Sequence, residues 1–283
     1  MIYDVAIIGA GPAGIAAATQ LKRQGMSFII FEKSRVGGLI LNANLIENYP
    51  GFPNGISGED FSKLLDQHLN ILKIDIIYQQ VLTVSYNYCY TINTETDSYN
   101  SKYCIFACGT LPNKLQKSLL INDPKIHYDL SSLKTVRNAD ILIIGSGDAA
   151  FDYALSLSKY NNIHIFSRTE KMKCLPLLVH RAKLVKNIKI DPNIEIQNIK
   201  KTSAKTIVNF KQKGNDNELE FDYILAAIGR YPDSSLFETV KEIIPVNSSF
   251  VIGDTISDNC RQASISVGSG IKAAMQIFHK INF

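Results

Sequence analysis

The chain has 283 residues, of which 46% are hydrophobic and 20% charged, and a formal net charge of +4. This length suits two domains of moderate size, each able to bury its own core. The mild, dispersed positive charge argues against a nucleic-acid partner, and no apolar run reaches the roughly 18 residues that a membrane span needs. The apolar N-terminal run has no basic segment before it and no cleavage-site pattern, so we expect a cytoplasmic protein.

The first predicted element is an apolar strand that runs into a glycine turn and a helix. DVAIIGAGPAG, from Asp4, contains Gly-x-Gly-x-x-Gly at Gly9, Gly11 and Gly14. The first glycine permits a tight turn, the second lets the backbone approach a pyrophosphate, and the third lets helix and strand pack closely. The phosphates then meet free N–H groups at the helix start. A single such pattern is also typical of an ordinary strand-to-helix turn.

The next strand, SFIIFEK, reaches Glu32. A carboxylate at this place accepts both ribose hydroxyls of an unphosphorylated adenosine, which suits FAD or NAD. The glycine pair Gly37 and Gly38 lets backbone approach a bound cofactor. An irregular loop, NYPGFPNGISGED, leads to a helix that begins near Ser57, where Ser-x-x-Asp resembles a capping box. Short strands between about 75 and 94 and the run KYCIFACGT complete this part of the chain.

A second copy of the strand, glycine turn and helix follows at DILIIGSGDAA, with Gly145, Gly147 and Ala150 in the three positions. Two copies in register, each followed by a second strand, predict two dinucleotide sites. At the same offset as Glu32 stands Arg168, and a slip of one residue would place Ser167 there. Neither is acidic, and two lysines follow, so a 2′-phosphate would meet cations and a hydroxyl. This pattern favours NADPH over NADH, although a solvated basic loop would look the same.

The last part of the chain predicts the domain organisation. Strands follow near 187–224 and at FDYILAAIG, RYPDSS is a linker, and SSFVIGDT is a strand ending in Asp254. RQASISVGSGIKAAMQIFHKI is a final helix, opened by Arg261, Gln262 and Ala263. That late strand has no sheet of its own, so we expect it to complete the first domain. The predicted fold class is α/β, with two Rossmann-like, three-layer ββα dinucleotide-binding domains, the second inserted into the first. The predicted FAD-binding domain is 1–114 with 231–283, and the predicted NAD(P)H-binding domain is 115–230.

The cysteines and histidines indicate neither a disulfide framework nor a metal site. The five cysteines form an odd set without a Cys-x-x-Cys pair. Cys104 and Cys108 lie on a predicted strand, about 13 Å apart at ~3.3 Å per residue, whereas bridged cysteines need Cα atoms within about 7 Å. We expect them to be small buried hydrophobic residues. The five histidines show no ligand spacing.

Taken together, the motifs resemble those of the low-molecular-weight thioredoxin reductases, a group that includes the thioredoxin reductase-like ferredoxin-NADP reductases. The resemblance covers essentially the whole chain and is carried by GAGPAG with Glu32, Gly37-Gly38, ENYPGFP, ACGT in place of the family's ATG, GSGDAA, AAIGRYP, and IGD followed by RQA. It implies FAD and NADP(H) as cofactors, with NADH possible, and a homodimer. In such a flavoprotein the last helix would direct its N–H groups at the flavin, where they stabilise the reduced ring.

The resemblance and the fingerprints together give two sets of predicted contacts. For FAD they are Gly9, Gly11, Pro12, Ala13, Gly14, Glu32, Lys33, Gly37, Gly38, Asn48, Val81, Gly109, Asp254, Arg261, Gln262 and Ala263. For the nicotinamide dinucleotide they are Gly145, Ser146, Gly147, Asp148, Ala149, Ser167, Arg168 and Lys173. The chemistry belongs to the flavin, so no protein side chain is predicted to be catalytic.

One departure from the family is specific. Thioredoxin reductases carry a redox-active Cys-x-x-Cys just ahead of the second fingerprint, where this chain has residues such as Tyr128, Asp129 and Ser131. The string HYDLSSL is more similar to the ferredoxin-NADP reductase branch, whereas RQA and NYPGFP are more like the thioredoxin reductases. The chain stops at Phe283, so we expect no C-terminal extension of the kind that covers the flavin in the ferredoxin-reducing branch.

These observations predict an FAD-dependent NAD(P)H oxidoreductase whose electrons leave to an external acidic carrier such as ferredoxin or flavodoxin. Such a carrier would be steered by basic groups, although surface lysines are usually just solvated. The basic groups considered are Lys22, Arg23, Lys33, Arg35, Arg181, Lys183 and Lys186. Two alternatives stay open: a disulfide reductase that uses unconventional thiols, with Cys260 as the candidate, and a non-catalytic protein that keeps FAD as a structural group.

Overall fold

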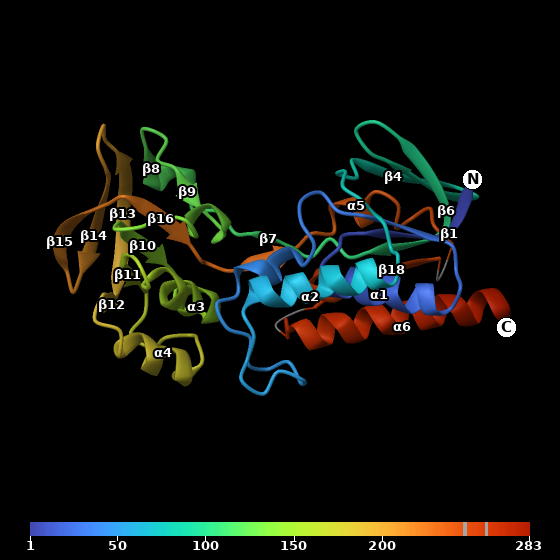
Figure 1. Ribbon diagram of the computed structural model, residues 1–283. Helices are drawn as coiled ribbons and strands as arrows, with labels where there is room; N and C mark the ends of the chain where they lie inside the picture. Colours follow the sequence, from blue (N-terminus) through green and yellow to red (C-terminus); the bar gives the residue numbers. More distant parts are fainter. Residues whose placement is uncertain (246–247, 258–259) are drawn as a thin grey trace. The chain divides into compact units, whose positions relative to one another are not determined.

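The computed structural model describes residues 1–245, 248–257 and 260–283, and these form two compact units (Figure 1). Unit 1 comprises Met1–Leu41, Ile46–Leu111 and Tyr231–Phe283, and unit 2 comprises Asn42–Leu45 and Pro112–Arg230. Unit 2 therefore interrupts the chain of unit 1. The boundaries lie at 111 and 230, against the predicted 114 and 230. The short segment Asn42–Leu45 lies with unit 2, which the sequence pattern did not indicate.

Unit 1 is built on a seven-stranded sheet in the order β3-β2-β1-β6-β5-β4, with β18 beside β6. β4 and β5 run antiparallel to their neighbours, and the other pairs are parallel. β18 pairs with Cys104–Phe106, so the prediction that the late strand completes the first sheet is confirmed. The strands are β1 (Ile2–Ile8), β2 (Phe28–Phe31), β3 (Ile76–Ile77), β4 (Thr83–Asn87), β5 (Cys89–Asn93), β6 (Ser98–Phe106) and β18 (Ser249–Val251).

The central strand β1 shows why this sheet lies between two layers. Val5 and Ile7 pack on one face against helices, while Ala6 and Ile8 pack on the other face against the β4–β5 hairpin and α5. This alternation buries both faces, as expected for the middle of a parallel sheet. The helices of unit 1 are α1 (Pro12–Arg23), α2 (Gly58–Ile71), α5 (Ser235–Glu238) and α6 (Ala263–Asn282), with 3-10 turns η1 (Gly38–Asn42) and η4 (Gly253–Thr255).

Unit 2 has a five-stranded parallel sheet in the order β12-β11-β10-β16-β9 and a second sheet in the order β15-β14-β13-β8. The parallel strands are β9 (Ile126–His127), β10 (Asp140–Ile144), β11 (Asn162–Phe166), β12 (Ile188–Asp191) and β16 (Tyr223–Ala226). The second sheet contains β8 (Leu120–Ile121), β13 (Ile194–Lys201), β14 (Thr206–Gln212) and β15 (Asn215–Phe221). β7 (Thr110–Pro112) pairs with β17 (Arg230–Pro232) where the chain passes between the units.

The helices of unit 2 cover the face of the parallel sheet opposite the second sheet. They are α3 (Asp148–Leu157) and α4 (Pro176–Lys183), with 3-10 turns η2 (Lys117–Leu119) and η3 (Ser131–Leu133). Ile141 and Ile143 of β10 pack in the same core as Phe151 of α3, while Leu142 and Ile144 pack in the core of the second sheet. The predicted α/β class and ββα layering are confirmed. The predicted strand FDYILAAIG is split, since β15 ends at Phe221 and β16 begins at Tyr223.

A close crossing of α1 and α6 fixes the helical layer of unit 1. A Cβ atom at Gly270 of α6 would lie 2.1 Å from the carbonyl oxygen of Ala13, so the two backbones are in contact. Gly253, with φ +66°, lies against the same residue, where an added Cβ would come 2.9 Å from the Ala13 Cβ. Its N–H donates to Ser269 Oγ at 2.9 Å. The crossing therefore holds η4 and α6 beside the first turn of α1.

We expect Gly270→Ala to destabilise the protein by about 2–4 kcal/mol, because neither backbone can move away without opening the core. Chemical denaturation measures this loss. The matched control is Gly268→Ala in the same helix, where an added Cβ meets nothing within 4 Å. Alanine should there stabilise the helix by about 0.5–1 kcal/mol. Equal effects of the two substitutions would contradict a tight crossing at Gly270.

Candidate functional site

Three helix starts expose backbone N–H groups. The described chain has four helices of ten or more residues, and only α2 begins with a side-chain cap, in which Ser57 Oγ accepts the Asp60 N–H at 3.1 Å. α1, α3 and α6 have Gly11, Gly147 and Gln262 as their cap residues and no hydrogen bond from a capping side chain. The free N–H groups and the positive end of the helix dipole suit an anion at each place.

The first glycine turn has the geometry of a pyrophosphate site. Gly9 has φ +108°, and a Cβ there would lie 2.4 Å from the carbonyl oxygen of Ala107, so the turn rests on the end of β6. At Gly14 a Cβ would lie 1.9 Å from the Gly9 oxygen. At Gly11, by contrast, a Cβ would meet nothing within 4 Å. The space in front of the α1 start is therefore open, while the turn behind it is closely packed.

Glu32 is held beside this turn. It follows β2, is only 8% exposed, and accepts the N–H groups of Ala10 at 2.8 Å and Ser34 at 2.9 Å. The Gly37 N–H donates to the Ala10 carbonyl oxygen at 2.9 Å, which brings the glycine pair back to the turn. Three other predicted contacts are spread around this region: Gly38 begins η1, Lys33 is exposed, and Val81 is buried in the core on the opposite face of the sheet.

The predicted flavin residues near the end of the chain lie in a 3-10 turn and a helix start. β18 ends at Val251, so Asp254 belongs to η4 and not to a strand end, because the chain turns at Gly253. Ser266 Oγ donates to Asp254 Oδ1 at 3.1 Å. Of Arg261, Gln262 and Ala263, which were predicted to open the last helix, only Ala263 lies in it. α6 begins at Ala263, with Gln262 as its cap residue.

Side chains that the sequence did not single out connect these segments. The Thr255 hydroxyl accepts the Gly109 N–H at 2.8 Å and donates to the Gly109 carbonyl at 3.2 Å. Thr255 thus joins η4 to the turn after β6. Asn48 Nδ2 donates to Gln262 Oε1, so the predicted loop residue reaches the start of α6. The sequence does show hydroxyl residues next to Gly253 and Asp254. It does not show which residues they bond to, because those partners are distant in sequence.

The second glycine turn repeats the first. A Cβ at Gly145 would lie 2.2 Å from the Ala227 carbonyl oxygen, and one at Gly147 would meet nothing within 4 Å. Ala150 takes the place of the third glycine and is fully buried. Ala149 lies exposed in the first turn of α3. Unit 2 therefore carries the same packed turn and open helix start as unit 1.

Strand pairing decides which residue of unit 2 corresponds to Glu32. The Gly9 N–H donates to the Phe31 oxygen, and the Gly145 N–H donates to the Phe166 oxygen. The residue after Phe31 is Glu32, so its counterpart is Ser167, and the one-residue slip is the correct alternative. Ser167 is buried and donates its hydroxyl to the Thr169 carbonyl at 2.8 Å. Arg168 follows as the exposed counterpart of Lys33.

The loop after Ser167 returns to the second glycine turn. The Lys173 N–H donates to the Ser146 carbonyl at 2.9 Å, and the Leu175 N–H donates to Asp148 Oδ1 at 2.8 Å. The acidic residue of this loop, Glu170, accepts a hydrogen bond from Asn193 Nδ2. The loop therefore presents cations near the α3 start while its carboxylate is engaged elsewhere.

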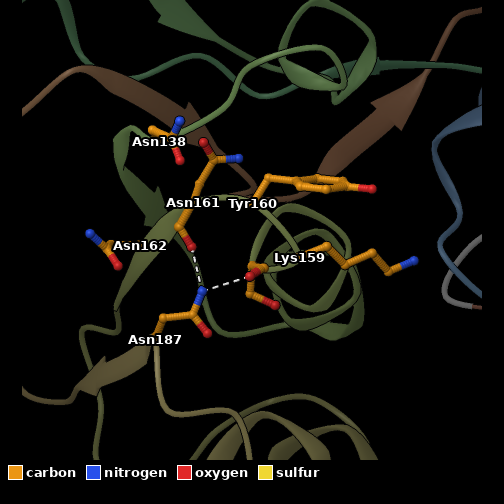
Figure 2. A pocket seen from close by; sticks show the side chains of 7 residues that line it. Asn138, Lys159, Tyr160, Asn161, Asn162 and Asn187 are labelled. Atoms are coloured by element: carbon orange, nitrogen blue, oxygen red, sulfur yellow. Dashed lines mark hydrogen bonds between the residues drawn. The ribbon is translucent and has the colours of Figure 1, made fainter.

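A polar pocket at the other end of α3 does not belong to this site. It is lined by Asn138, Ser158, Lys159, Tyr160, Asn161, Asn162 and Asn187. Figure 2 shows the Asn187 amide between two main-chain oxygens, those of Ser158 at 2.6 Å and Asn161 at 2.7 Å. The Asn161 amide likewise bonds to the main chain of Leu157, Val136 and Ala139. These amides hold the turn after α3 and serve a structural role.

The partly buried thiols of Cys108 and Cys174 do not suggest nucleophiles. Burial raises the pKa of Cys108 to about 12 and that of Cys174 to about 11. Both thiols are therefore protonated at neutral pH, whereas the reactive form of cysteine is the thiolate. Cys104 is fully buried in the core, as predicted. Within the described residues no group of three or more His, Cys, Asp and Glu could hold a metal ion, and no helix is long and apolar enough to span a membrane.

Comparison with known proteins decides the family. The family model described as pyridine nucleotide-disulphide oxidoreductase matches residues 3–265. The chain belongs to this family. A crystal structure of Lactococcus lactis thioredoxin reductase is similar with a TM-score of 0.86 and 27% identity, over 98% of each chain.

Two curated relatives show how far the similarity extends. The bifunctional thioredoxin reductase/thioredoxin of Mycobacterium leprae is 26% identical over 97% of this chain, which spans 65% of that relative. The "34.2 kDa protein in rubredoxin operon" of Clostridium pasteurianum is 28% identical, over 96% of this chain and 95% of the relative. The predicted likeness to thioredoxin reductases is thus confirmed.

This pyridine nucleotide-disulphide oxidoreductase family match also confirms FAD and NADPH as the predicted cofactors. The residues present fit both groups. Unit 1 offers an open helix start at Gly11 and a fixed carboxylate at Glu32, as an unphosphorylated adenosine ribose requires. Unit 2 offers an open helix start at Gly147, with Ser167 and Arg168 where the carboxylate would stand. The individual contacts remain predictions.

We expect Gly11→Ala to abolish FAD retention and Gly147→Ala to weaken NADPH binding at least tenfold, each without unfolding the protein. In both cases the new methyl group would occupy space that a pyrophosphate needs, and both backbones have conformations open to alanine. Flavin absorbance of the purified proteins and NADPH titration measure the two effects. The two variants are controls for each other. Gly11→Ala should leave the fold of unit 2 unchanged, and Gly147→Ala should leave the flavin content unchanged.

Asp152, one turn after Asp148, is a partly buried acid in unit 2. It lies under the segment Asn42–Leu45 and accepts the Asn44 N–H at 2.7 Å. Burial raises its pKa to about 6, with Asp148 adding to the rise, while the Asn44 and Leu45 N–H groups and Lys159 oppose it. Because the folded pKa exceeds the ordinary 3.8, the folded chain binds more protons between pH about 4 and 6. Its contribution to stability therefore falls as pH rises through that window.

We expect Asp152→Asn to be more stable than the natural chain at pH 7.5, by about 1–2 kcal/mol. An amide carbonyl still accepts the loop N–H groups without the cost of burying a charge. The difference should shrink at pH 4.5, where the aspartate is protonated. Thermal melts at the two pH values test this, with Glu218→Gln on the exposed strand β15 as the control. A stability difference independent of pH would contradict it.

Proposed function

We propose that this chain is an FAD-dependent NADPH oxidoreductase that passes electrons to an external one-electron carrier protein of the ferredoxin or flavodoxin class. The observation that carries the proposal is in the printed sequence: its five cysteines include no two that are three positions apart. A disulfide relay of the Cys-x-x-Cys kind is therefore not available within this chain. We also propose the homodimer that the family resemblance implies.

The segment ahead of the second fingerprint supports this proposal. Where thioredoxin reductases carry their two cysteines, Tyr128 accepts the Leu115 N–H at 3.2 Å and lies under Lys114 Nζ, 3.7 Å from its ring centre. Asp129 accepts the Ser131 N–H at 3.0 Å, and His127 Nδ1 bonds to Ser132 Oγ at 2.6 Å. These side chains fix the segment within unit 2. In this segment, hydrogen-bonding side chains stand where a thioredoxin reductase has its redox-active cysteines.

The remaining residues support roles in binding and orientation. When bound, FAD supplies the group that takes two electrons from the nicotinamide and releases them to an acceptor. The start of α6 directs its free N–H groups at the place where the resemblance puts the flavin, and Thr255 and Ser266 orient Gly109 and Asp254 around it. On the nucleotide side, Arg168 and Lys173 favour a 2′-phosphate, since no carboxylate repels it there.

The names of the relatives point to two acceptor classes. Relatives named thioredoxin reductase support a disulfide as the electron acceptor. If this chain reduces disulfides as a second function, exposed Cys260 is the candidate thiol. The relative named for a rubredoxin operon is associated by that name with a one-electron iron carrier. The absence of a Cys-x-x-Cys pair favours the one-electron class here.

Anaerobic reduction tests the proposed function. We expect NADPH to bleach the flavin at a lower concentration than NADH, and reoxidation by ferredoxin or flavodoxin to be faster than by thioredoxin. Flavin absorbance measures both steps. Turnover of thioredoxin that Cys260→Ser abolishes would establish the disulfide reductase instead. A flavin that stays oxidised under excess NADPH would indicate a non-catalytic FAD protein.

A further inference from the structure

Helix α4 of unit 2 exposes apolar side chains to solvent. Leu175, Leu177 and Leu184 are 58%, 50% and 71% exposed. The helix packs on its core through Ala182, with Leu178, Val179 and Val185 partly buried beside it. Helical periodicity then turns Leu177, His180 and Leu184 outward together. We define the α4 face as the exposed side chains of Leu175, Leu177, His180, Lys183, Leu184 and Lys186.

Positive charge, expected to be dispersed along the chain, is concentrated in this segment. No Asp or Glu occurs from 171 to 190, a span with six basic residues: Lys171, Lys173, Arg181, Lys183, Lys186 and Lys189. The complete chain has a net charge of only +4, so this segment accounts for more than the net positive charge of the protein. The α4 face is thus an apolar centre with a basic border.

We infer that the α4 face is the docking surface for the acidic electron carrier, an inference that rests on the proposed function. A partner that fits it has carboxylates around an exposed apolar patch. The carboxylates would meet Lys183 and Lys186, while the apolar patch would cover the leucines. Charge complementarity of this kind steers encounter and fixes orientation, and apolar contact at the centre holds the complex.

Other occupants fit the face less well. A second copy of this chain would bring its own α4 lysines against these lysines if the faces paired symmetrically, and like charges repel. Helices that lie on membranes bury one apolar face and keep their cations on the opposite face, and many have about 20–30 residues. α4 has eight residues, and Lys183 and Leu184 are both exposed at its end. An exposed apolar patch with polar residues around it is typical of an interaction site.

The test compares two double charge reversals on unit 2. Lys183→Glu with Lys186→Glu alters the α4 face, and Lys200→Glu with Lys201→Glu makes the same charge change on exposed residues of β13. For the first variant we expect kcat/KM with ferredoxin or flavodoxin to fall at least tenfold at low ionic strength. Salt near 0.5 M should shrink the difference, because screening removes the steering. Leu184→Ser should weaken carrier binding at all salt concentrations.

Reduction of a small neutral quinone by NADPH is the internal control and should be equal in all variants. Ferredoxin turnover that is unchanged by the α4 reversal overturns the inference and leaves the proposed function standing. Failure of the natural protein to reduce either carrier, with quinone reduction intact, overturns both. Loss of binding to phosphatidylserine vesicles in the α4 variant, with carrier kinetics unchanged, would assign the face to a lipid surface instead and so also overturns the inference.

Discussion

Both nucleotide sites depend on one contact, the close approach of a glycine Cα to a carbonyl oxygen of the neighbouring strand. Gly9 lies against Ala107, just after β6, and Gly145 lies against Ala227, just after β16. Any side chain at either glycine would separate the turn from that strand. The helix start would then shift, and its N–H groups would no longer face the open space in front of the turn. The contact occurs independently in two units, which is how one chain holds two dinucleotides.

Both units share one arrangement of strand, glycine turn and helix start, and a few residues beside it are predicted to determine which nucleotide each unit favours. Glu32 and Ser167 occupy the same place after the second strand, and both are buried and held by backbone hydrogen bonds. Gly37 and Lys173 also correspond, because their N–H groups donate to Ala10 and Ser146, which precede the second glycine of each turn. We therefore predict that this shared arrangement positions the adenosine ribose in each unit, and that the carboxylate or its absence selects between a free and a phosphorylated 2′-oxygen.

The sequence predicted this arrangement well because the fingerprints and strand patterns are local. It left Ser167 and Arg168 unresolved because the second copy is one residue shorter between Gly145 and Phe166, and only strand hydrogen bonds reveal where the residue is missing. It extended the late strand to Asp254, since the apolar run does not show that Gly253 turns the chain. The role of Thr255 and the burial of Asp152 depend on partners more than a hundred residues away.

The replacement of the cysteine pair changes what unit 2 contributes. In a chain with a thiol relay, the segment ahead of the second fingerprint would carry electrons, and selectivity for the acceptor would reside partly in thiol chemistry. Here that segment is fixed by Tyr128, Asp129 and His127, and the thiols of Cys108 and Cys174 are protonated. Under the proposed function, electrons that reach the flavin leave directly to the carrier that docks on the protein. Selectivity for that acceptor becomes a matter of surface shape and charge, which act through association rather than through bond exchange.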